Sequence, residues 1–431
     1  MIIGGRQSPI LLFAGDFVAF ILSLYLTLWL RYFEVPNGAM LSPYVVPFTL
    51  LFIFWTLVFY SVGLYSKRFT LFPSRLPDAL FKTQIANILF AALFFFFIPA
   101  FGIAPKTILA LYLVISLAII FFWRLVVYQR LSSGHFRERA ILLTRGAEAD
   151  ELFAEVNANP RYGIEFCSRE LTHESASMIV ADSATAVDSL TGTNKHIIAF
   201  EDVYEEVFDR VPLSQLERAW FRENVASSDP LLYVITKRCI DIVGGFVMGL
   251  ITLVIAPFIY IANMFEGDGP LFLKQERFGK LGSKITVYKF RSMQKDIAAS
   301  GKWTHEHNDE NRVTKVGAFL RLTSLDEFPQ FINVIRGEIS LIGPRSDILG
   351  LGKRLAEALP YYEARYFVVP GITGWAQINQ QYEQGHVSPQ SIEETKVRLA
   401  YDFYYLKHRS LGLDIIIAIK TIKRMFFRLS S

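Results

Sequence analysis

Residues 242–265 read IVGGFVMGLITLVIAPFIYIANMF, and the placement of the rest of the chain follows from this apolar segment. It contains the roughly 20 apolar residues that a helix needs to cross a bilayer. Lys237 and Arg238 precede it, and six further cations follow it: Lys274, Arg277, Lys280, Lys284, Lys289 and Arg291. Because Lys and Arg beside apolar segments favour the cytoplasmic side of a membrane, both flanks are expected on that side.

Pro257 lies inside the segment, where it removes a backbone hydrogen bond and bends or breaks a helix. We therefore predict a re-entrant helix over residues 237–265, which enters the membrane, is interrupted at the proline and returns to the cytoplasm. Lys237 and Asp241 lie at the N-terminal end of this helix, where they are expected to anchor it or to pair with other charged groups. For Lys237 the alternative is that its side chain simply extends toward the lipid headgroups. A fifth crossing helix, which would export the rest of the chain, is the alternative to re-entry.

The whole chain has the composition of a membrane protein. Of its 431 residues 52% are hydrophobic and 19% are charged, whereas a typical soluble chain has about 25% charged residues. Four more apolar stretches near the N-terminus are long enough to cross a bilayer: 10–30, 44–64, 85–104 and 107–128. They predict a four-helix transmembrane domain over residues 1–132. Basic residues gather in its second loop and after its fourth helix, which places both ends of this domain in the cytoplasm.

Residues 136–212 have a soluble composition and a βαβ pattern. A short apolar strand over 140–143 is followed by a helix, and further strands are predicted at 177–181 and 196–200. A dinucleotide-binding Rossmann site has three glycines in its first turn, but only Gly146 is present here. This pattern predicts a degenerate Rossmann-like, non-catalytic cytoplasmic domain, with nucleotide binding as the alternative.

Residues 213–232 are interpreted as a polar linker, and residues 233–431 as a basic, mixed α/β domain with the re-entrant helix at its start. The overall class is a membrane protein with α and α/β parts. Its two cysteines, Cys167 and Cys239, form no CxxC or Cys/His pattern, which excludes disulfide scaffolds and structural zinc sites. The C-terminal helix, with apolar residues and late Lys and Arg, is a candidate interfacial helix; packing against its own domain is the alternative.

The candidate site is the stretch 321–330, which reads RLTSLDEFPQ. A carboxylate attacks a phosphate effectively only where cations neutralise the electrophile. Arg321 lies five residues before Asp326, and Arg345 stands on a Gly-Pro-Arg turn further along the chain. Asp326 or Glu327 is therefore predicted to act on a phosphate beside a metal. A solvated charged turn is one alternative; a capping box of Ser324 and Glu327 is another, which Pro329 disfavours.

From residue 237 to about residue 423 the chain resembles the monotopic phosphoglycosyl transferases, or bacterial sugar transferases. The resemblance rests on several motifs in one order: GPLF at 269–272, KFRSM at 289–293, SLDEFPQ at 324–330, SLIGPR at 340–345 and PGITG at 370–374. The four helices and Rossmann-like domain in front resemble the large members of that family, whose N-terminal parts are not catalytic. One departure is Ser346, where the family usually has a proline.

The resemblance implies transfer of a hexose 1-phosphate from a UDP-sugar to undecaprenyl phosphate, the first membrane step of exopolysaccharide, capsule or O-antigen synthesis. It implies that Asp326 attacks the β-phosphate, that UMP leaves, and that the aspartyl-phosphosugar then passes its sugar phosphate to the lipid. It further implies that Glu327 helps Asp326 to hold Mg²⁺ or tunes that carboxylate, and that four cations bind phosphate oxygens: Arg321, Arg345, Lys289 and Arg291.

By the same resemblance, the chain is a multi-pass protein of the bacterial inner membrane with its catalytic domain on the cytoplasmic face. The expected partners are a UDP-sugar, undecaprenyl phosphate and membrane lipids, and no nucleic acid is expected. The sequence leaves open which sugar is transferred and whether two copies form a homodimer. The alternative function is a non-catalytic membrane sensor or scaffold of polysaccharide assembly.

Overall fold

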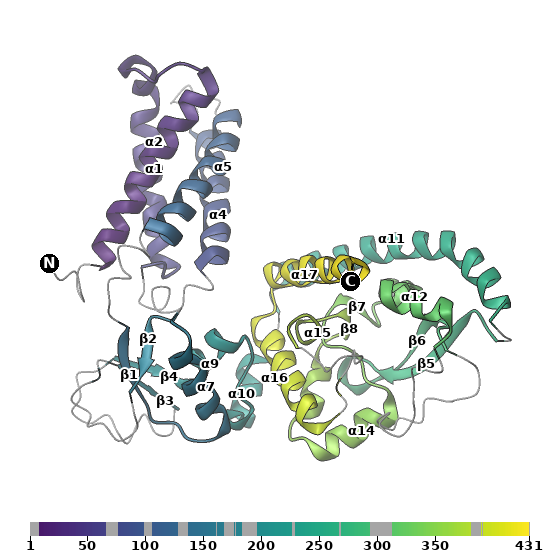
Figure 1. Ribbon diagram of the computed structural model, residues 1–431. Helices are drawn as coiled ribbons and strands as arrows, with labels where there is room; N and C mark the ends of the chain where they lie inside the picture. Colours follow the sequence, from purple (N-terminus) through teal and green to yellow (C-terminus); the bar gives the residue numbers. More distant parts are fainter. Residues whose placement is uncertain are drawn as a thin grey trace. The chain divides into compact units, whose positions relative to one another are not determined.

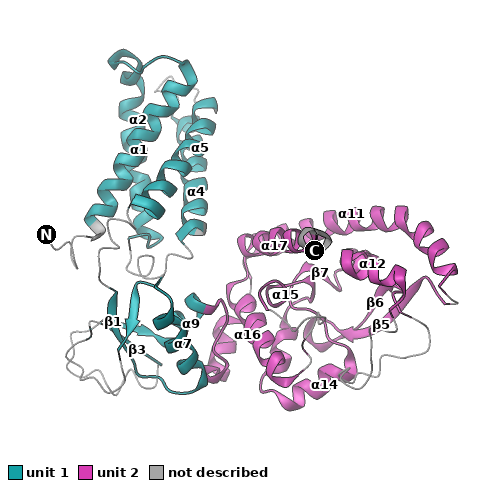
Figure 2. Cartoon of the chain, viewed as in Figure 1, with its two compact units in different colours: residues 1–207 teal, residues 208–431 magenta. Residues whose placement is uncertain are grey.

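The computed structural model describes residues 8–65, 76–98, 106–127, 137–160, 162–167, 176, 178–182, 196–225, 229–266, 269–293, 313–380, 389 and 391–430. The chain divides into two compact units, residues 1–207 and 208–431 (Figure 2).

Unit 1 begins with helices that lie alongside one another (Figure 1): α1 (Ser8–Tyr32), α2 (Gly38–Ser61), α4 (Leu76–Phe97) and α5 (Lys106–Phe122), the last continued by a π-helix, η3 (Trp123–Val127). Aromatic side chains dominate the core between them; Phe20, Phe48, Trp55 and Tyr112 are completely buried. Within the described ranges, and with α11 of unit 2 included, five helices are long and apolar enough to cross a membrane. The expectation of a membrane protein with several long apolar helices is confirmed.

An ion pair is buried among these helices. Arg124, in η3, donates from Nε to Asp16 Oδ1 of α1 at 2.9 Å and from Nη1 to the carbonyl of Leu64 at 2.9 Å. Both charged side chains are almost completely buried. Because an unpaired charge is expensive in an apolar environment, this pair fixes how α1 meets the end of α5.

The rest of unit 1 is a parallel sheet in the order β2-β1-β3-β4. Its strands are β1 (Glu138–Leu142), β2 (Ile164–Phe166), β3 (Met178–Ala181) and β4 (His196–Ala199), and its helices are α7 (Ala147–Ala158) and α9 (Phe200–Phe208). Gly146 precedes α7 with φ +121°, a conformation that favours glycine. Glu148 and Asp150 occupy the first turn of α7, where negative charge opposes a pyrophosphate. This mixed α/β structure agrees with the degenerate Rossmann-like pattern.

Unit 2 opens with η5 (Leu213–Gln215) and α10 (Arg218–Asn224), in the stretch expected to be a polar linker. Trp220 and Phe221 of α10 are buried in the core of unit 2, where both rings contact Phe403. The described part of this stretch is therefore packed against unit 2. Its apolar aromatic residues, rather than its polar ones, determine its position.

Helix α11 (Leu231–Met264) covers the apolar segment. The helix is continuous through Pro257, and Figure 1 shows it bending toward its C-terminal end. The interruption expected at this proline is thus a bend within one helix, because a proline can be accommodated where the helix curves.

The body of unit 2 contains an antiparallel pair, β5 (Phe272–Phe278) and β6 (Lys284–Phe290), joined through η6 (Lys280–Gly282), and a short parallel pair, β7 (Ser340–Ile342) and β8 (Gly371–Thr373). Its remaining helices are α12 (Lys315–Thr323), η9 (Leu325–Gln330), α13 (Phe331–Arg336), α14 (Leu349–Ala358), η10 (Tyr362–Phe367), α15 (Trp375–Asn379), α16 (Ile392–His408) and α17 (Leu411–Ser430).

Two charged residues near the start of α11 tie this helix to unit 2. Lys237 Nζ pairs with Asp414 Oδ2 of α17 at 2.8 Å and donates to the carbonyl of Ile342 at 3.0 Å. Asp241 Oδ1 accepts hydrogen bonds from Ser340 Oγ at 3.0 Å and from the amide of Leu341 at 2.9 Å. Lys237 is thus an anchoring residue, and both contacts fix α11 to β7, directly before the Gly-Pro-Arg turn.

Candidate active site

The Asp-Glu pair lies on the 3-10 helix η9. Ser324 ends α12 in the left-handed conformation, with φ 58°, and the chain then turns sharply into η9. The Ser324 side chain caps neither helix, so the capping box is not formed. Pro329 fits inside this short helix because a 3-10 turn has few internal amide bonds to lose.

Two cations from distant parts of the chain hold Glu327. Lys289 Nζ, on β6, lies 2.7 Å from Glu327 Oε1, and Arg345 Nη2 lies 2.6 Å from the same oxygen. Arg345 Nη1 also donates to Glu327 Oε2 at 3.4 Å, so the guanidinium contacts both oxygens of the Glu327 carboxylate. Burial by itself raises the pKa of this carboxyl, but Arg345 and Lys289 lower it more, and the net pKa of Glu327 lies well below its ordinary value.

Asp326 is in a different situation although it is the adjacent residue. Among the residues that the structure describes, none forms a hydrogen bond or an ion pair with its carboxylate. Burial is the main reason why the pKa of Asp326 is raised, and the charge of Glu327 raises it further, whereas Lys289, Arg345 and Arg321 oppose the shift. The site therefore contains one carboxylate fixed by two cations and, in the part of the chain that the structure describes, one without a partner.

The other predicted phosphate ligands lie in different places. Arg321 is exposed at the end of α12, donates from Nε to Ser292 Oγ at 3.2 Å, and lies close enough to Asp326 to lower its pKa. Arg291 is buried and donates from Nη2 to the carbonyl of Asn263 at 3.0 Å. The structure thus brings Lys289 and Arg345 together at Glu327, with Arg321 nearby, while Arg291 engages the C-terminal end of α11.

The carboxylates were also predicted as Mg²⁺ ligands. Mg²⁺ is commonly held by one or two carboxylates together with substrate phosphates and water, and the uncommitted oxygens of Asp326 fit that arrangement. Glu327 fits it less well, since both its oxygens already contact cations. Within the described ranges, no group of three or more His, Cys, Asp or Glu residues could hold a metal ion without a ligand from a substrate.

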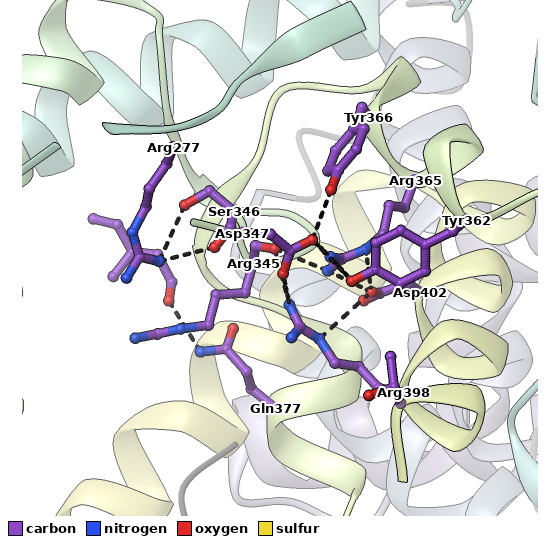
Figure 3. A network of polar contacts seen from close by, with 12 residues as sticks. Arg277, Arg345, Ser346, Asp347, Tyr362, Arg365, Tyr366, Gln377, Arg398 and Asp402 are labelled. Carbon is purple, nitrogen blue, oxygen red and sulfur yellow. Dashed lines mark hydrogen bonds and ion pairs between the residues drawn. The ribbon is translucent and has the colours of Figure 1, made fainter. Parts of the chain in front are cut away.

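A buried network of charges lies behind the Gly-Pro-Arg turn (Figure 3). Its centre is Asp347, which pairs with Arg365 and accepts hydrogen bonds from Tyr362 and Tyr366, each at 2.9 Å. Arg365 also pairs with Asp402 at 2.7 Å. Burial raises the pKa of Asp347, but Arg365 and Arg398 lower it more, to a net value of about 2.

This network holds the backbone on which Arg345 stands. The Arg345 carbonyl accepts hydrogen bonds from Arg365 Nη2 at 2.8 Å and from Arg398 Nη2 at 2.9 Å. Arg277 Nη1 donates to the carbonyl of Ser346 at 2.8 Å and lies 3.4 Å from its hydroxyl. Ser346, in the place of the family's usual proline, is therefore held by hydrogen bonds, and the Arg345 side chain extends away from the network (Figure 3).

Arg365, Arg398 and Asp402 support the site but were not among the residues predicted for it. Arg398 and Asp402 are four residues apart on α16, but this spacing also occurs in ordinary surface ion pairs, so it predicts nothing by itself. The only nearby signal is the position of Asp347, two residues after Arg345.

Comparison with known proteins agrees with this geometry. The family model described as "Bacterial sugar transferase" matches residues 232–428. The chain is 35% identical over 196 residues to an exopolysaccharide production protein of Rhizobium leguminosarum bv. phaseoli, covering 44% of this chain and 94% of that protein. This chain belongs to the bacterial sugar transferase family.

Two larger relatives carry more specific names. A UDP-N-acetylgalactosamine-undecaprenyl-phosphate N-acetylgalactosaminephosphotransferase of Aeromonas hydrophila is 36% identical over 194 residues, which are 44% of each chain. A UDP-glucose:undecaprenyl-phosphate glucose-1-phosphate transferase of Escherichia coli (strain K12) is 39% identical over 193 residues, which are 44% of this chain and 40% of that protein. The match spans less than half the length of these two relatives.

The buried network yields a prediction about stability. We expect Arg398→Gln to reduce the free energy of unfolding by about 1–3 kcal/mol, because it leaves Asp347 and Asp402 with one buried partner fewer. The measurement is thermal unfolding of the full chain in detergent. Lys396→Gln is the matched control, two residues away on α16, whose exposed pair with Glu393 contributes little. Equal midpoints for the two variants would contradict the role of the network.

Proposed function

We propose that the chain transfers a hexose 1-phosphate from a UDP-sugar to undecaprenyl phosphate and so initiates exopolysaccharide, capsule or O-antigen synthesis. The observation that carries this proposal is the contrast between the two carboxylates: Glu327 is fixed by Lys289 and Arg345, while the Asp326 carboxylate beside it has no partner among the described residues. Family membership and the names of the relatives support it. A non-catalytic sensor or scaffold would need no such contrast, so that alternative is not favoured.

In the proposed reaction, a carboxylate oxygen of Asp326 attacks the β-phosphorus of the donor. The bond from that phosphorus to the bridging oxygen breaks, and UMP leaves with this oxygen. A phosphate oxygen of the lipid then attacks the same phosphorus and releases Asp326, giving a lipid diphosphate-linked sugar. Lys289, Arg345 and Arg321 would neutralise the phosphate oxygens during both steps, because donors placed in advance where charge develops stabilise a transition state.

Mg²⁺, when bound, would supply further neutralisation of the phosphates, and Asp326 is the residue that would hold it together with them. Glu327 would act mainly by keeping Lys289 and Arg345 in position. This assignment separates the roles of the two adjacent carboxylates.

We also propose a membrane arrangement that suits a soluble donor and a lipid acceptor. The four N-terminal helices form a transmembrane bundle, and α11 is re-entrant, with both ends in the cytoplasm. Helix α17 lies at the interface: Ile415, Ile419 and Ile422 are each more than half exposed and recur at helical spacing. The catalytic unit is then on the cytoplasmic face of the inner membrane. A homodimer stays a prediction.

We expect Asp326→Asn to abolish the reaction, with turnover reduced at least about a thousandfold. The neutral amide of asparagine cannot act as the nucleophile, and because it is about as large as the carboxyl group of aspartate, the fold should be preserved. The assay is UMP release from a panel of UDP-sugars with undecaprenyl phosphate, together with retention of labelled sugar phosphate on the denatured protein. Release of UDP instead of UMP, or label on the variant equal to that on the wild type, would refute the mechanism.

The raised pKa of Asp326 predicts how the rate depends on pH. Activity should fall as the pH drops through this raised pKa, because the protonated carboxyl cannot attack. Glu327→Gln removes a negative neighbour and leaves Lys289 and Arg345 unneutralised, so the acidic limb of the profile should move to lower pH. The exposed substitution Glu393→Gln is the control and should leave the limb in place. An unchanged or upward-shifted limb in Glu327→Gln would contradict the proposed coupling.

The re-entrant arrangement can be tested by cysteine labelling. With Cys167 and Cys239 replaced by serine, neither Leu231→Cys nor Phe265→Cys should react with an impermeant maleimide applied to spheroplasts. Both should react after permeabilisation, since both side chains are highly exposed. Val35→Cys, in the loop between α1 and α2, is the periplasmic control and should react in intact spheroplasts. Reaction at residue 265 but not at residue 231 would show that α11 crosses the membrane.

A further inference from the structure

An apolar groove of about 560 Å³ lies where α11, α12 and η9 meet. Helix α11 contributes Phe258 and Ala262, α12 contributes Val316 and Phe319, and η9 contributes Leu325. Among the lining residues only Lys315 is charged. The groove is therefore built to accept hydrocarbon, and its volume lies within the roughly 300–1,000 Å³ that is usual for small-ligand sites.

One edge of the groove adjoins the candidate active site. Leu325 lines the groove and Asp326 is the next residue of η9; likewise Leu320 lines the groove and Arg321 follows it on α12. Two of the lining residues, Ile259 and Leu320, belong to one buried cluster with Phe290, which directly follows Lys289 on β6. Helices η9 and α12 and strand β6 thus each carry a charged residue of the candidate site next to a residue of the groove or of this cluster.

This combination has the chemistry of an amphiphile with one apolar chain and an anionic head. The lining offers almost no hydrogen-bonding groups to a phosphate, whereas Lys289, Arg345 and Arg321 offer cations just beyond it. A chain lying in the groove would therefore extend its phosphate toward Asp326. The volume is sufficient only for the part of a long chain nearest to its head, and the rest would stay in the bilayer.

We propose that this groove binds the first isoprene units of the polyprenyl phosphate acceptor and thereby positions its phosphate for attack at Asp326. This inference rests on the proposed function and adds the place of the acceptor chain. It assigns Phe319, Ala262 and Leu325 to acceptor recognition, a role separate from donor chemistry.

The first test fills the groove. We expect Ala262→Phe to raise the KM for undecaprenyl phosphate roughly tenfold, while exchange of labelled UMP into the UDP-sugar, which needs no acceptor, stays at the wild-type rate. Val254→Phe is the matched control: it adds a phenyl ring to a lipid-exposed position of α11 outside the groove and should change neither quantity. An unchanged acceptor KM in Ala262→Phe, or an equal loss of exchange and transfer, would overturn the proposal.

The second test does not depend on activity. Wild-type protein in phosphatidylcholine vesicles is irradiated with undecaprenyl phosphate that carries a diazirine on its first isoprene units, and labelled peptides are mapped. Labelling concentrated in 255–262 and 315–325 supports the groove. Labelling elsewhere, or equal labelling of these peptides by diazirine-phosphatidylglycerol, overturns it. If the wild type releases no UMP from any UDP-sugar, the proposed function fails, yet this mapping still decides whether the groove binds the polyprenyl chain.

Discussion

The ion pairs of Glu327 with Lys289 and Arg345 are the interaction on which the site depends. They join the 3-10 helix η9 to strand β6 and to the Gly-Pro-Arg turn, across sequence separations of 38 and 18 residues. All three groups are largely buried, so losing one partner would leave uncompensated charge in a medium of low polarity. A consequence is that Glu327 is held in place, and Asp326 is presented beside it without a partner of its own among the described residues.

The same turn connects the site to the apolar helix α11 and to the interior of unit 2. On one side, Lys237 and Asp241 of α11 bind the backbone or side chains of β7, which leads directly into the turn. On the other side, Arg365 and Arg398 donate to the carbonyl of Arg345. The backbone around Arg345, which pairs with Glu327, is therefore held by hydrogen bonds from helix α11 on one side and from the buried charge network on the other. This arrangement suits the proposed reaction, in which a soluble donor and a lipid acceptor would meet in a defined geometry.

The network itself illustrates how buried charges act. Replacing a buried ion pair with apolar residues is often neutral for stability, so Asp347, Arg365 and Asp402 are better explained by geometry than by stabilisation alone. Two tyrosine hydroxyls complete the hydrogen bonding of Asp347. In a fully satisfied network of this kind, movement of one member disturbs the others, which makes the turn rigid even though Ser346 stands in the place of a proline.

The long apolar helices, the βαβ pattern of unit 1 and the nearness of Arg321 and Arg345 to the Asp-Glu pair could be predicted from the sequence alone. These features depend on local composition and on short motifs, which can be recognised in the linear sequence. Folding in three dimensions was needed to fix Glu327 between two cations and to leave Asp326 without a partner among the described residues. It also brings Arg291 to the end of α11, packs the predicted linker through Trp220, and places Arg365 and Arg398 against the turn. Each of these outcomes depends on residues far apart in the chain, and the energy of a charge depends on its burial and its partners, which exist only once the chain has folded.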